Sequence, residues 1–386
     1  MEENLRKKKI LYISGTRADY GLMKNTLLEI SKNPKLDLEI IATGMHLMPK
    51  FGRTLKEIKK DGFKVHKIEA VYKKDSKESA VDFIGKLIQL LNKELKKIKP
   101  DIILVLGDRA EALAGAVSGV YLVIPVAHVH GGDVSMTVDD VARHAITKLS
   151  SIHFAATEKS SKRIIKMGEN PWRVYVVGAP GLDGILKSKI AAQKNITQKY
   201  HLDLSKPLLL VIQHPVTAEI NRAGIHIEET MSAIKELGYQ SIVVYPNADA
   251  GSRKMIQVIE KYRKYPFIKI HKNIPRFEYL SLMRIASCIV GNSSGGIIEA
   301  PSFGLPAVNI GTRQKGREKS DNVIDVGYKK EDIKKAIKKA IYDKIFRKKT
   351  KSYKSPYGSG DAGKKIAKIL SEVTIDDRLL NKTITY

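Results

Sequence analysis

Residues 8–32, KKILYISGTRADYGLMKNTLLEISK, carry the pattern that decides the fold. Residues 8–14 form a short run rich in Ile, Leu and Tyr, which is typical of a buried strand, whereas residues 22–32 repeat apolar side chains at helical spacing. A turn that contains Gly15 separates the two. The same order of strand, turn and helix recurs along the chain, and it predicts βαβ units with a parallel sheet.

The alternation falls into two blocks, and a more polar, lysine-rich stretch separates them at residues 180–206. In the first block we expect strands at residues 8–14, 38–44, 101–107, 122–128, 151–157 and 173–179. In the second block we expect strands at residues 208–214, 241–247, 267–272, 287–292 and 306–311. The pattern predicts an α/β protein with two doubly wound, Rossmann-like domains that face each other across a cleft.

We expect four parts along the chain. These are an N-terminal domain at residues 1–180, a connecting region at 181–206, a C-terminal domain at 207–360, and a C-terminal helix and tail at 361–386. The residues from Thr374 are predicted to form a loosely ordered tail. Because ligands of open parallel sheets bind beyond the carboxyl ends of the strands, the polar motifs at these ends are the candidate site residues.

Composition narrows the classes of protein. The chain has 386 residues, with 68 Lys and Arg against 41 Asp and Glu, which gives a net charge of +27. The lysines are spread over expected helix faces and aromatic residues make up only 6%, so a nucleic-acid partner is not expected. A single cysteine, Cys288, allows no disulfide within the chain. The sequence shows no signal peptide and no membrane-spanning stretch, so we expect a cytoplasmic protein with no membrane partner.

The most specific motif is GNSSGGIIEAPSFG, residues 291–304. A strand ends at Gly291, and Ser293, Ser294 and Gly295 then open a helix, whose free N–H groups and serine hydroxyls can bind a phosphate. Glu299 lies one helical turn further and can accept hydrogen bonds from ribose hydroxyls. The alternative is a plain serine cap with glycines for tight packing.

Three further strand ends carry ionisable residues. In SGTRADYG, either Arg17 binds a phosphate oxygen, or Asp19 caps a helix and Arg17 lies on the surface. In LGDRAEA, Asp108 is either an acid–base group or a cap of the helix that begins at Arg109. His214 precedes a proline in IQHPVT, and is either directed into the cleft or bonded to backbone.

Residues 128–144, HVHGGDVSMTVDDVARH, concentrate the most ionisable groups. His128 and His130 are two positions apart on an expected strand, so their side chains are expected to point the same way, as in some metallohydrolases. A metal would need further ligands, and none follow in a matching pattern, so we expect no metal. In the second half, Thr137 and Asp140 resemble a capping box, which leaves Asp139 for proton transfer.

These motifs together resemble the hydrolysing UDP-N-acetylglucosamine 2-epimerases of the sialic-acid type, over about residues 8–372. The resemblance implies a GT-B fold, no cofactor, a nucleotide-sugar substrate, and a homodimer or homotetramer. It also implies a two-step reaction. A base removes the proton at C2 while UDP leaves C1 by anti elimination, and water then adds to the 2-acetamidoglucal to release N-acetylmannosamine. The family's residue at position 130 is often glutamate, where this chain has histidine.

The resemblance also implies roles for single residues. Asp108, Asp139, His130 and His214 match catalytic positions, and residues 274–280 are expected near uracil. The residues expected to bind the nucleotide or its phosphates are Arg17, Asn247, Ser293, Ser294, Gly295, Glu299 and Arg313. The residues expected near the sugar are His46, Arg109, Arg143 and His144.

Three alternatives remain open at this point. A non-hydrolysing epimerase would give UDP-N-acetylmannosamine instead of the free sugar. A metallohydrolase would use the HVHGGD segment, and a nucleotide-sugar sensor would bind UDP without catalysis. The sequence leaves the sugar substituents at C4 and C6, and the choice between UDP and GDP, open.

Overall fold

The computed structural model describes residues 6–49, 54–72, 77–134, 138–185, 193–246, 251–352 and 355–386. The chain divides into two compact units. Unit 1 takes its described residues from Met1–Asp133, Asp139–Gly184 and Tyr357–Tyr386, and unit 2 takes its own from Val134–Val138 and Ile185–Pro356. The last helices of the chain therefore belong with its first strands.

Unit 1 is built on a seven-stranded sheet of parallel strands in the order β3-β2-β1-β4-β5-β6-β7. Its strands are β1 (Lys8–Ser14), β2 (Leu36–Ala42), β3 (Lys64–Lys67), β4 (Ile102–Leu106), β5 (Val126–Val129), β6 (Ile152–Ala155) and β7 (Val174–Val176). Its helices are α1 (Arg17–Lys32), η1 (Gly44–Leu47), α2 (Leu55–Lys60), α3 (Lys77–Ile98), α4 (Ala110–Tyr121), α5 (Val138–Leu149), α6 (Glu158–Lys166), η3 (Pro171–Arg173), η4 (Pro180–Leu182), α14 (Ala362–Glu372) and α15 (Asp377–Leu380).

Unit 2 repeats this architecture with a six-stranded parallel sheet in the order β10-β9-β8-β11-β12-β13. Its strands are β8 (Leu208–Ile212), β9 (Gln240–Val244), β10 (Ile268–His271), β11 (Cys288–Gly291), β12 (Ala307–Ile310) and β13 (Val323–Val326). Its helices are α7 (Gln193–Lys199), η5 (Thr217–Arg222), α8 (Ala223–Leu237), α9 (Ser252–Lys261), η6 (Tyr262–Lys264), α10 (Arg276–Ile285), α11 (Gly295–Ile298), η7 (Ala300–Phe303), α12 (Lys330–Tyr342) and α13 (Lys344–Ser352).

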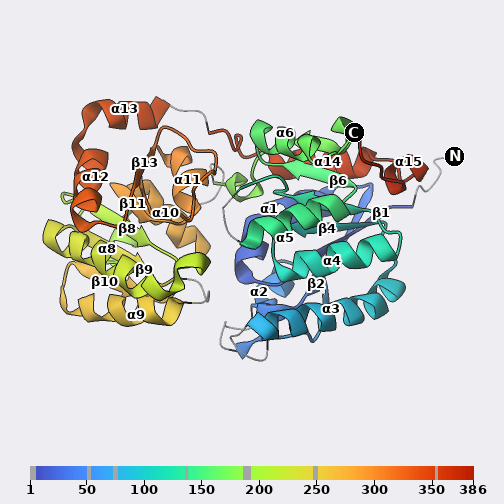
Figure 1. Ribbon diagram of the computed structural model, residues 1–386, viewed down its shortest axis with the longest axis horizontal. Coiled ribbons are helices and arrows are strands. Elements are labelled where there is room, and N and C mark those ends of the chain that lie inside the picture. The colour runs from blue at the N-terminus through green and yellow to red at the C-terminus, as the bar shows by residue number, and fades with distance from the viewer. Residues whose placement is uncertain are drawn as a thin grey trace. The chain divides into compact units, whose positions relative to one another are not determined.

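Both sheets are buried between helices, which explains the continuous apolar runs of their central strands. In β1, Ile10 and Tyr12 face a core that includes α1 and α14, while Leu11 and Ile13 face a second core with α3 and α4 (Figure 1). In unit 2, helices α8, α9 and α12 supply the side chains that cover one face of the sheet. The two predicted doubly wound domains are thus confirmed as two parallel α/β sheets.

In each sheet the strand order reverses beside the first strand of the unit, between β1 and β4 and between β8 and β11. Such a switch point leaves a crevice at the carboxyl ends of the two strands, which is where open α/β sheets bind ligands. Two edge strands, β3 and β13, were not predicted. Their sequences, KVHK and VIDV, mix polar and apolar residues and are at most partly buried, so they lack the long apolar run of a central strand.

The residues from Thr374 are ordered, so the prediction of a loose tail was wrong. Arg173 donates hydrogen bonds to the carbonyl of Leu379 (2.8 Å) and to that of Ser151 (3.1 Å). Lys382 donates to the carbonyl of Lys148 at 2.6 Å and to that of Ser150 at 2.7 Å, near the end of α5. It also pairs with Glu169 at 2.8 Å. Arg173 and Lys382 therefore attach the tail to the rest of unit 1, and the composition of the tail did not reveal these contacts.

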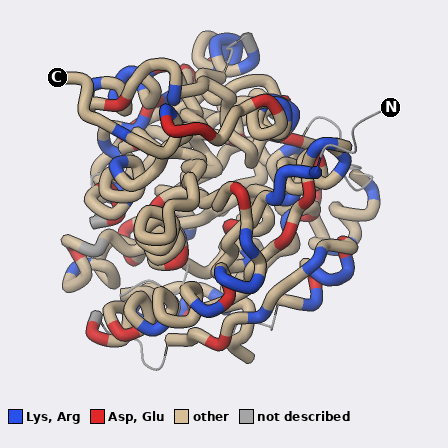
Figure 2. The backbone as a smooth tube through the Cα atoms, turned by 90° about the vertical axis from the view of Figure 1, so that its right-hand side faces the viewer, with Lys and Arg blue, Asp and Glu red and all other residues tan. Residues whose placement is uncertain are grey.

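The distribution of charge and the polarity of the helices complete the description. Lys and Arg occur along much of the backbone, interspersed with Asp and Glu (Figure 2). In the described part of the chain, every helix is too short or too polar to cross a membrane.

Candidate active site

Arg143 lies at the centre of the ionisable cluster in unit 1. From α5 it donates hydrogen bonds to Asp108, which follows β4, to Asp140 (2.5 Å) and to the backbone carbonyl of Asp133 (2.9 Å). Its side chain is only 4% exposed. Burial opposes its charge, but Asp108 and Asp133 more than offset this, and the pKa of the guanidinium is raised. A buried cation thus holds two carboxylates together at the carboxyl edge of the sheet.

His130 belongs to the same edge. The strand β5 ends at Val129, and His130 has a left-handed backbone conformation with φ of 64°. Its Nδ1 lies 2.9 Å from Oδ2 of Asp133, and the other oxygen of Asp133 accepts a hydrogen bond of 2.7 Å from Ser160. The prediction that His128 and His130 both lie on a strand was wrong for His130, because β5 ends at Val129.

His128 has a structural role. It is fully buried, its Nε2 lies 2.7 Å from the carbonyl of Gly107, and its Nδ1 lies 3.2 Å from the hydroxyl of Thr147. Burial lowers the pKa of His128 to about 3, so the ring is neutral and ties the end of β4 to α5. Among the described residues, no group of three or more His, Cys, Asp or Glu side chains could hold a metal ion.

The start of α5 places Asp139 and Asp140 in its first turn, where the helix dipole favours negative charge. Thr137, the expected partner in a capping box, lies outside the described residues. Burial lowers the pKa of His144, one helical turn beyond Asp140. The alternative in which Asp108 caps the following helix is wrong, because α4 begins at Ala110 with Arg109 at its N-cap position. Asp108 is held by Arg143 instead.

The turn after β1 forms a second buried polar cluster in unit 1. Thr16, and not Asp19, is the N-cap of α1, and Asp19 completes a capping box with it. Asp19 also accepts a hydrogen bond from Ser14, whose hydroxyl lies 2.9 Å from Nε2 of His46. Burial raises the pKa of Asp19 to about 6, and burial together with Arg109 lowers that of His46 to about 4. His46 is therefore a fully buried, neutral hydrogen-bonding group.

The remaining predicted residues of unit 1 are Arg17 and Arg109. Arg17 lies at the surface and pairs with Glu57 at 3.2 Å. Arg109 pairs with the buried Glu111 at 3.2 Å. The carboxylate of Glu111 fills the space beside Gly15, where a Cβ atom would lie 2.2 Å from it. A side chain at position 15 would therefore displace the Glu111 carboxylate, which pairs with Arg109.

In unit 2, His214 and Asn292 join the ends of β8 and β11. The side chain of Asn292 accepts a hydrogen bond from the N–H of His214 (2.7 Å) and donates one to its carbonyl (2.9 Å). Arg313 and Gln314 donate to the carbonyl of Asn292, at 3.2 and 2.9 Å. Burial, and next the charge of Arg313, lower the pKa of His214 to about 3. Asn292 thus connects the predicted residues His214 and Arg313.

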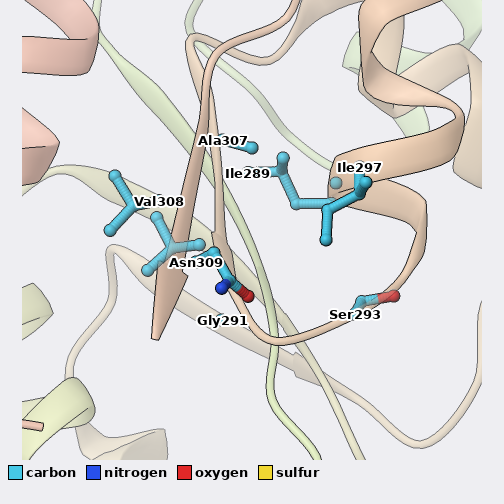
Figure 3. Close-up of a pocket in the computed structure, with 9 residues that line it drawn as sticks. Ile289, Gly291, Ser293, Ile297, Ala307, Val308 and Asn309 are labelled. Carbon is cyan, nitrogen blue, oxygen red and sulfur yellow. The ribbon is translucent and has the colours of Figure 1, made fainter. Parts of the chain in front are cut away.

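The loop from Gly291 to Gly295 is closely packed. Gly291 has φ of 127°, and a Cβ atom there would lie 2.0 Å from the carbonyl oxygen of Ile212. At Gly295 a Cβ atom would lie 2.3 Å from the hydroxyl of Tyr279. Ser293 accepts a hydrogen bond of 3.3 Å from the N–H of Gly295. Figure 3 shows Ser293 on this loop as one of the residues that line a mostly apolar pocket, together with residues of β11, β12 and α11.

Glu299 follows this loop but lies outside the helix on which it was expected, because α11 ends at Ile298. It is buried and forms an ion pair with Arg276, the first residue of α10. The structure thus brings Glu299 to the 274–280 segment, as a shared polar cluster. Asn247 lies outside the described residues.

Four residues around the turn that carries Arg313 were not predicted as site residues. Glu219 accepts hydrogen bonds of 2.7 Å from Thr312 and from Tyr328. The ring of Tyr328 stacks on His226 with centroids 3.5 Å apart, and a Cβ atom at Gly311 would lie 2.2 Å from it. This cluster braces the turn that carries Arg313. Its members come from η5, α8 and the turns after β12 and β13, and no local motif connects them.

Comparison with known proteins shows the family to which the chain belongs. The sequence model of the family described as UDP-N-acetylglucosamine 2-epimerase matches residues 28–371. A Legionella pneumophila UDP-N,N'-diacetylbacillosamine 2-epimerase (hydrolyzing) is 39% identical over 98% of this chain and 100% of that protein. A Neisseria meningitidis UDP-N-acetylglucosamine 2-epimerase is 36% identical over 86% of this chain and 87% of its own.

The fold is likewise similar to a solved structure. The crystal structure of UDP-GlcNAc 2-epimerase from Neisseria meningitidis bound to UDP-GlcNAc has a TM-score of 0.81 at 21% identity, and covers 94% of this chain and 99% of that chain. The two parallel α/β sheets with their polar switch points therefore define a GT-B-type protein. Within this class, the chain belongs to the UDP-N-acetylglucosamine 2-epimerase family.

Proposed function

We propose that the protein is a hydrolysing 2-epimerase that converts a UDP-linked 2-acetamido sugar into the free 2-epimer and UDP. The observation that carries the proposal is the cluster around Arg143, which holds Asp108 and Asp140 at the sheet edge where His130 also lies. Proton transfer at an unactivated sugar carbon needs acid–base groups in fixed positions, and a buried arginine supplies that fixation.

The proposed reaction has two steps. In the elimination, a base takes the proton from C2, the C–H electrons form the C1=C2 double bond, and the C1–O electrons leave with UDP. In the hydration, water gives a hydroxyl to C1 and C2 gains a proton from the other face, so the configuration at C2 is inverted. Asp108, His130 and Asp139 are proposed for proton transfer, and Arg143, Arg109, His46 and His144 for the sugar side of the site.

We assign the sugar chemistry to residues 1–180 and nucleotide binding to residues 207–360. His214, Ser293, Ser294, Gly295 and Arg313 are proposed at the diphosphate, together with Arg17. Glu299 and Asn247 are proposed at the nucleoside, with the 274–280 segment near uracil. The hydrogen bonds that join Asn292 to His214 and to Arg313 support this assignment, because they hold the phosphate candidates together.

The hydrolysing outcome is favoured by two relatives whose names state it. Besides the Legionella protein, a Campylobacter jejuni GDP/UDP-N,N'-diacetylbacillosamine 2-epimerase (hydrolyzing) is 34% identical over 83% of this chain and 85% of that protein. Both names carry a sugar modified at C4, so the substrate panel must include UDP-N,N'-diacetylbacillosamine beside UDP-GlcNAc. We further propose a cytoplasmic homodimer or homotetramer, which light scattering after gel filtration tests.

The decisive experiment incubates the protein with each UDP- and GDP-sugar in deuterated water and identifies products by NMR. We expect UDP and a free 2-epimerised sugar that carries deuterium at C2. The Asp108→Asn variant serves as the chemistry control and should bind substrate while its kcat is lower by about 100-fold or more. Recovery of an intact UDP-linked epimer would establish the non-hydrolysing reaction, and the absence of UDP or GDP release from every donor would overturn the proposal.

A further inference from the structure

The turn from His130 to Asp133 is fixed from two neighbouring helices. Arg143 of α5 donates to the carbonyl of Asp133, and Arg163 of α6 donates to the carbonyl of Gly132. Gly132 has φ of 73°, and a Cβ atom there would lie 2.4 Å from the backbone oxygen of Ser160. The left-handed conformation of His130 is uncommon for a residue with a side chain, so it persists because these contacts hold it.

Within this turn a chain of hydrogen bonds runs from Ser160 through Asp133 to His130. The Ser160 hydroxyl donates to Oδ1 of Asp133 at 2.7 Å, and Nδ1 of His130 lies 2.9 Å from Oδ2. Asp133 is only 6% exposed, and the nearby guanidinium of Arg143 is attracted to its charge. A carboxylate can only accept hydrogen bonds, so His130 must donate from Nδ1.

We propose that Asp133 is a positioning residue that fixes the tautomer of His130, so that proton transfer at C2 of the sugar uses Nε2 of His130. The inference rests on the proposed hydrolysing 2-epimerase function. With Nδ1 carrying the hydrogen, Nε2 keeps its lone pair, and this nitrogen is the only basic atom of the ring. The histidine that replaces a glutamate thus acquires a carboxylate partner three positions further along the chain.

The step balances without any co-reactant beyond water. Nε2 of His130 bonds to the C2 proton while UDP departs with the C1–O electron pair, which leaves an imidazolium stabilised by Asp133. In the hydration, a protonated carboxylic acid on the opposite face gives its proton to C2 and takes one from the water that adds to C1. The proton on His130 then passes to solvent, and both groups return to their starting states.

The tautomer itself can be measured without any substrate. In protein labelled with ¹⁵N-histidine, proton–nitrogen correlation spectra at pH 8 should show His130 with a hydrogen on Nδ1 and a bare Nε2. The spectrum of a His130→Gln variant assigns the signal. In Asp133→Ala the ring hydrogen of His130 should shift toward Nε2. In Ser161→Ala, a control at a buried residue next to Ser160 on α6, the hydrogen should stay on Nδ1. A wild-type His130 that carries its hydrogen on Nε2 would overturn the proposal, whatever the activity.

The kinetic test uses two backgrounds. In the wild type, Asp133→Asn should lower kcat for UDP release by about 10-fold or more, since an orienting carboxylate acts through the histidine that it holds. In a His130→Glu background, the same substitution should change kcat by less than about 2-fold, because a carboxylate base has no tautomer to fix. An equal loss in both backgrounds would show a merely structural role. If no sugar is turned over at all, the proposed function fails, while the spectra still decide the tautomer.

Discussion

Arg143 and Asp108 lie 35 positions apart in the chain, yet the guanidinium of one donates a hydrogen bond to the carboxylate of the other. The strand order brings the two residues together, because β4 and β5 are neighbours. Asp108 follows β4, and Arg143 lies on α5, the helix that follows β5. Asp108 is the more exposed partner, with 27% of its side chain accessible against 4% for Arg143. The buried Arg143 therefore fixes Asp108 by a hydrogen bond, while the carboxylate of Asp108 stays accessible to a ligand.

This pair leads to a prediction about catalysis. Asp108→Asn should lower kcat about 100-fold or more, because the amide cannot exchange a proton with the sugar. Arg143→Lys should lower kcat about 10-fold, since an ammonium group cannot span both carboxylates as the guanidinium does. Initial rates of UDP release give both values. Lys166→Met, on the exposed face of α6, is the matched control and should retain full activity. Full activity in Asp108→Asn would exclude it from the chemistry.

The second prediction concerns the brace of Glu219 and Tyr328. Tyr328→Phe and Glu219→Gln each remove or weaken a hydrogen bond of 2.7 Å that holds the turn before Arg313. We expect the Kd for UDP to rise about 3- to 10-fold, which is the worth of one net hydrogen bond, with kcat nearly unchanged. Calorimetric titration with UDP measures the Kd.

The control for the brace is Tyr342→Phe, which alters an exposed hydroxyl contact of 3.2 Å to Tyr239. It should leave UDP binding unchanged. If Tyr328→Phe lowered kcat while UDP bound as before, the brace would act on the chemistry instead of on the nucleotide.

The third prediction compares two glycines of unit 2. Gly295→Ala places a methyl group 2.3 Å from the Tyr279 hydroxyl, so the loop or the tyrosine must move. We expect a loss of about 1–3 kcal/mol in the free energy of unfolding, and weaker UDP binding. At Gly224 of α8 the nearest atom to a new methyl group is 3.9 Å away, so Gly224→Ala should be neutral or stabilising by up to about 1 kcal/mol. Chemical denaturation of both variants makes the comparison, and equal costs would contradict it.

The fourth prediction concerns acid stability. Burial lowers the pKa of His128 to about 3 and is the main cause that lowers those of His46 and His214 to about 4 and about 3, from 6.5. Below pH 6.5 the unfolded chain therefore binds more protons than the folded one, and stability falls as the pH falls. Burial raises the pKa of Asp19 to about 6 and also raises that of Asp183, so these two carboxyls oppose the trend, but the three buried histidines outnumber them.

We expect the Tm to decrease steadily from pH 6.5 to pH 4. His128→Gln keeps an amide donor for the Gly107 carbonyl but cannot titrate, so its Tm should depend less steeply on pH over this range. Differential scanning fluorimetry at half-unit pH steps gives both curves. Identical slopes for the two proteins would show that His128 does not titrate on unfolding.

The fold was largely predictable because its central strands are buried on both faces and thus read as apolar runs. Residues 8–14 are one example, and the predicted range matches β1. The edge strand at Lys64–Lys67 was missed because half-exposed strands carry polar residues. The tail was misjudged since Arg173 and Lys382 bind backbone carbonyls, and any sequence supplies those.

Candidate site residues were recognisable where a motif follows a strand, as with Asp108 and Ser293. Their partners were less so. Arg143 was expected near the sugar only from the resemblance, and its contact with Asp108 depends on which strands are adjacent. The brace around Glu219 unites segments more than 90 positions apart, and therefore leaves no local signal.

The last ordered segment has a consequence for how the protein is made. Residues 357–386 pack with β1 and α1, so unit 1 is interrupted in sequence by unit 2. During synthesis the residues of unit 2 leave the ribosome before the final helices of unit 1 exist. Unit 2 can therefore fold first. Until the final helices are made, the earlier strands and helices of unit 1 lack the packing that these helices provide. A nascent chain stalled before residue 357 would expose the surface that these helices cover, and this makes it the natural target for a chaperone.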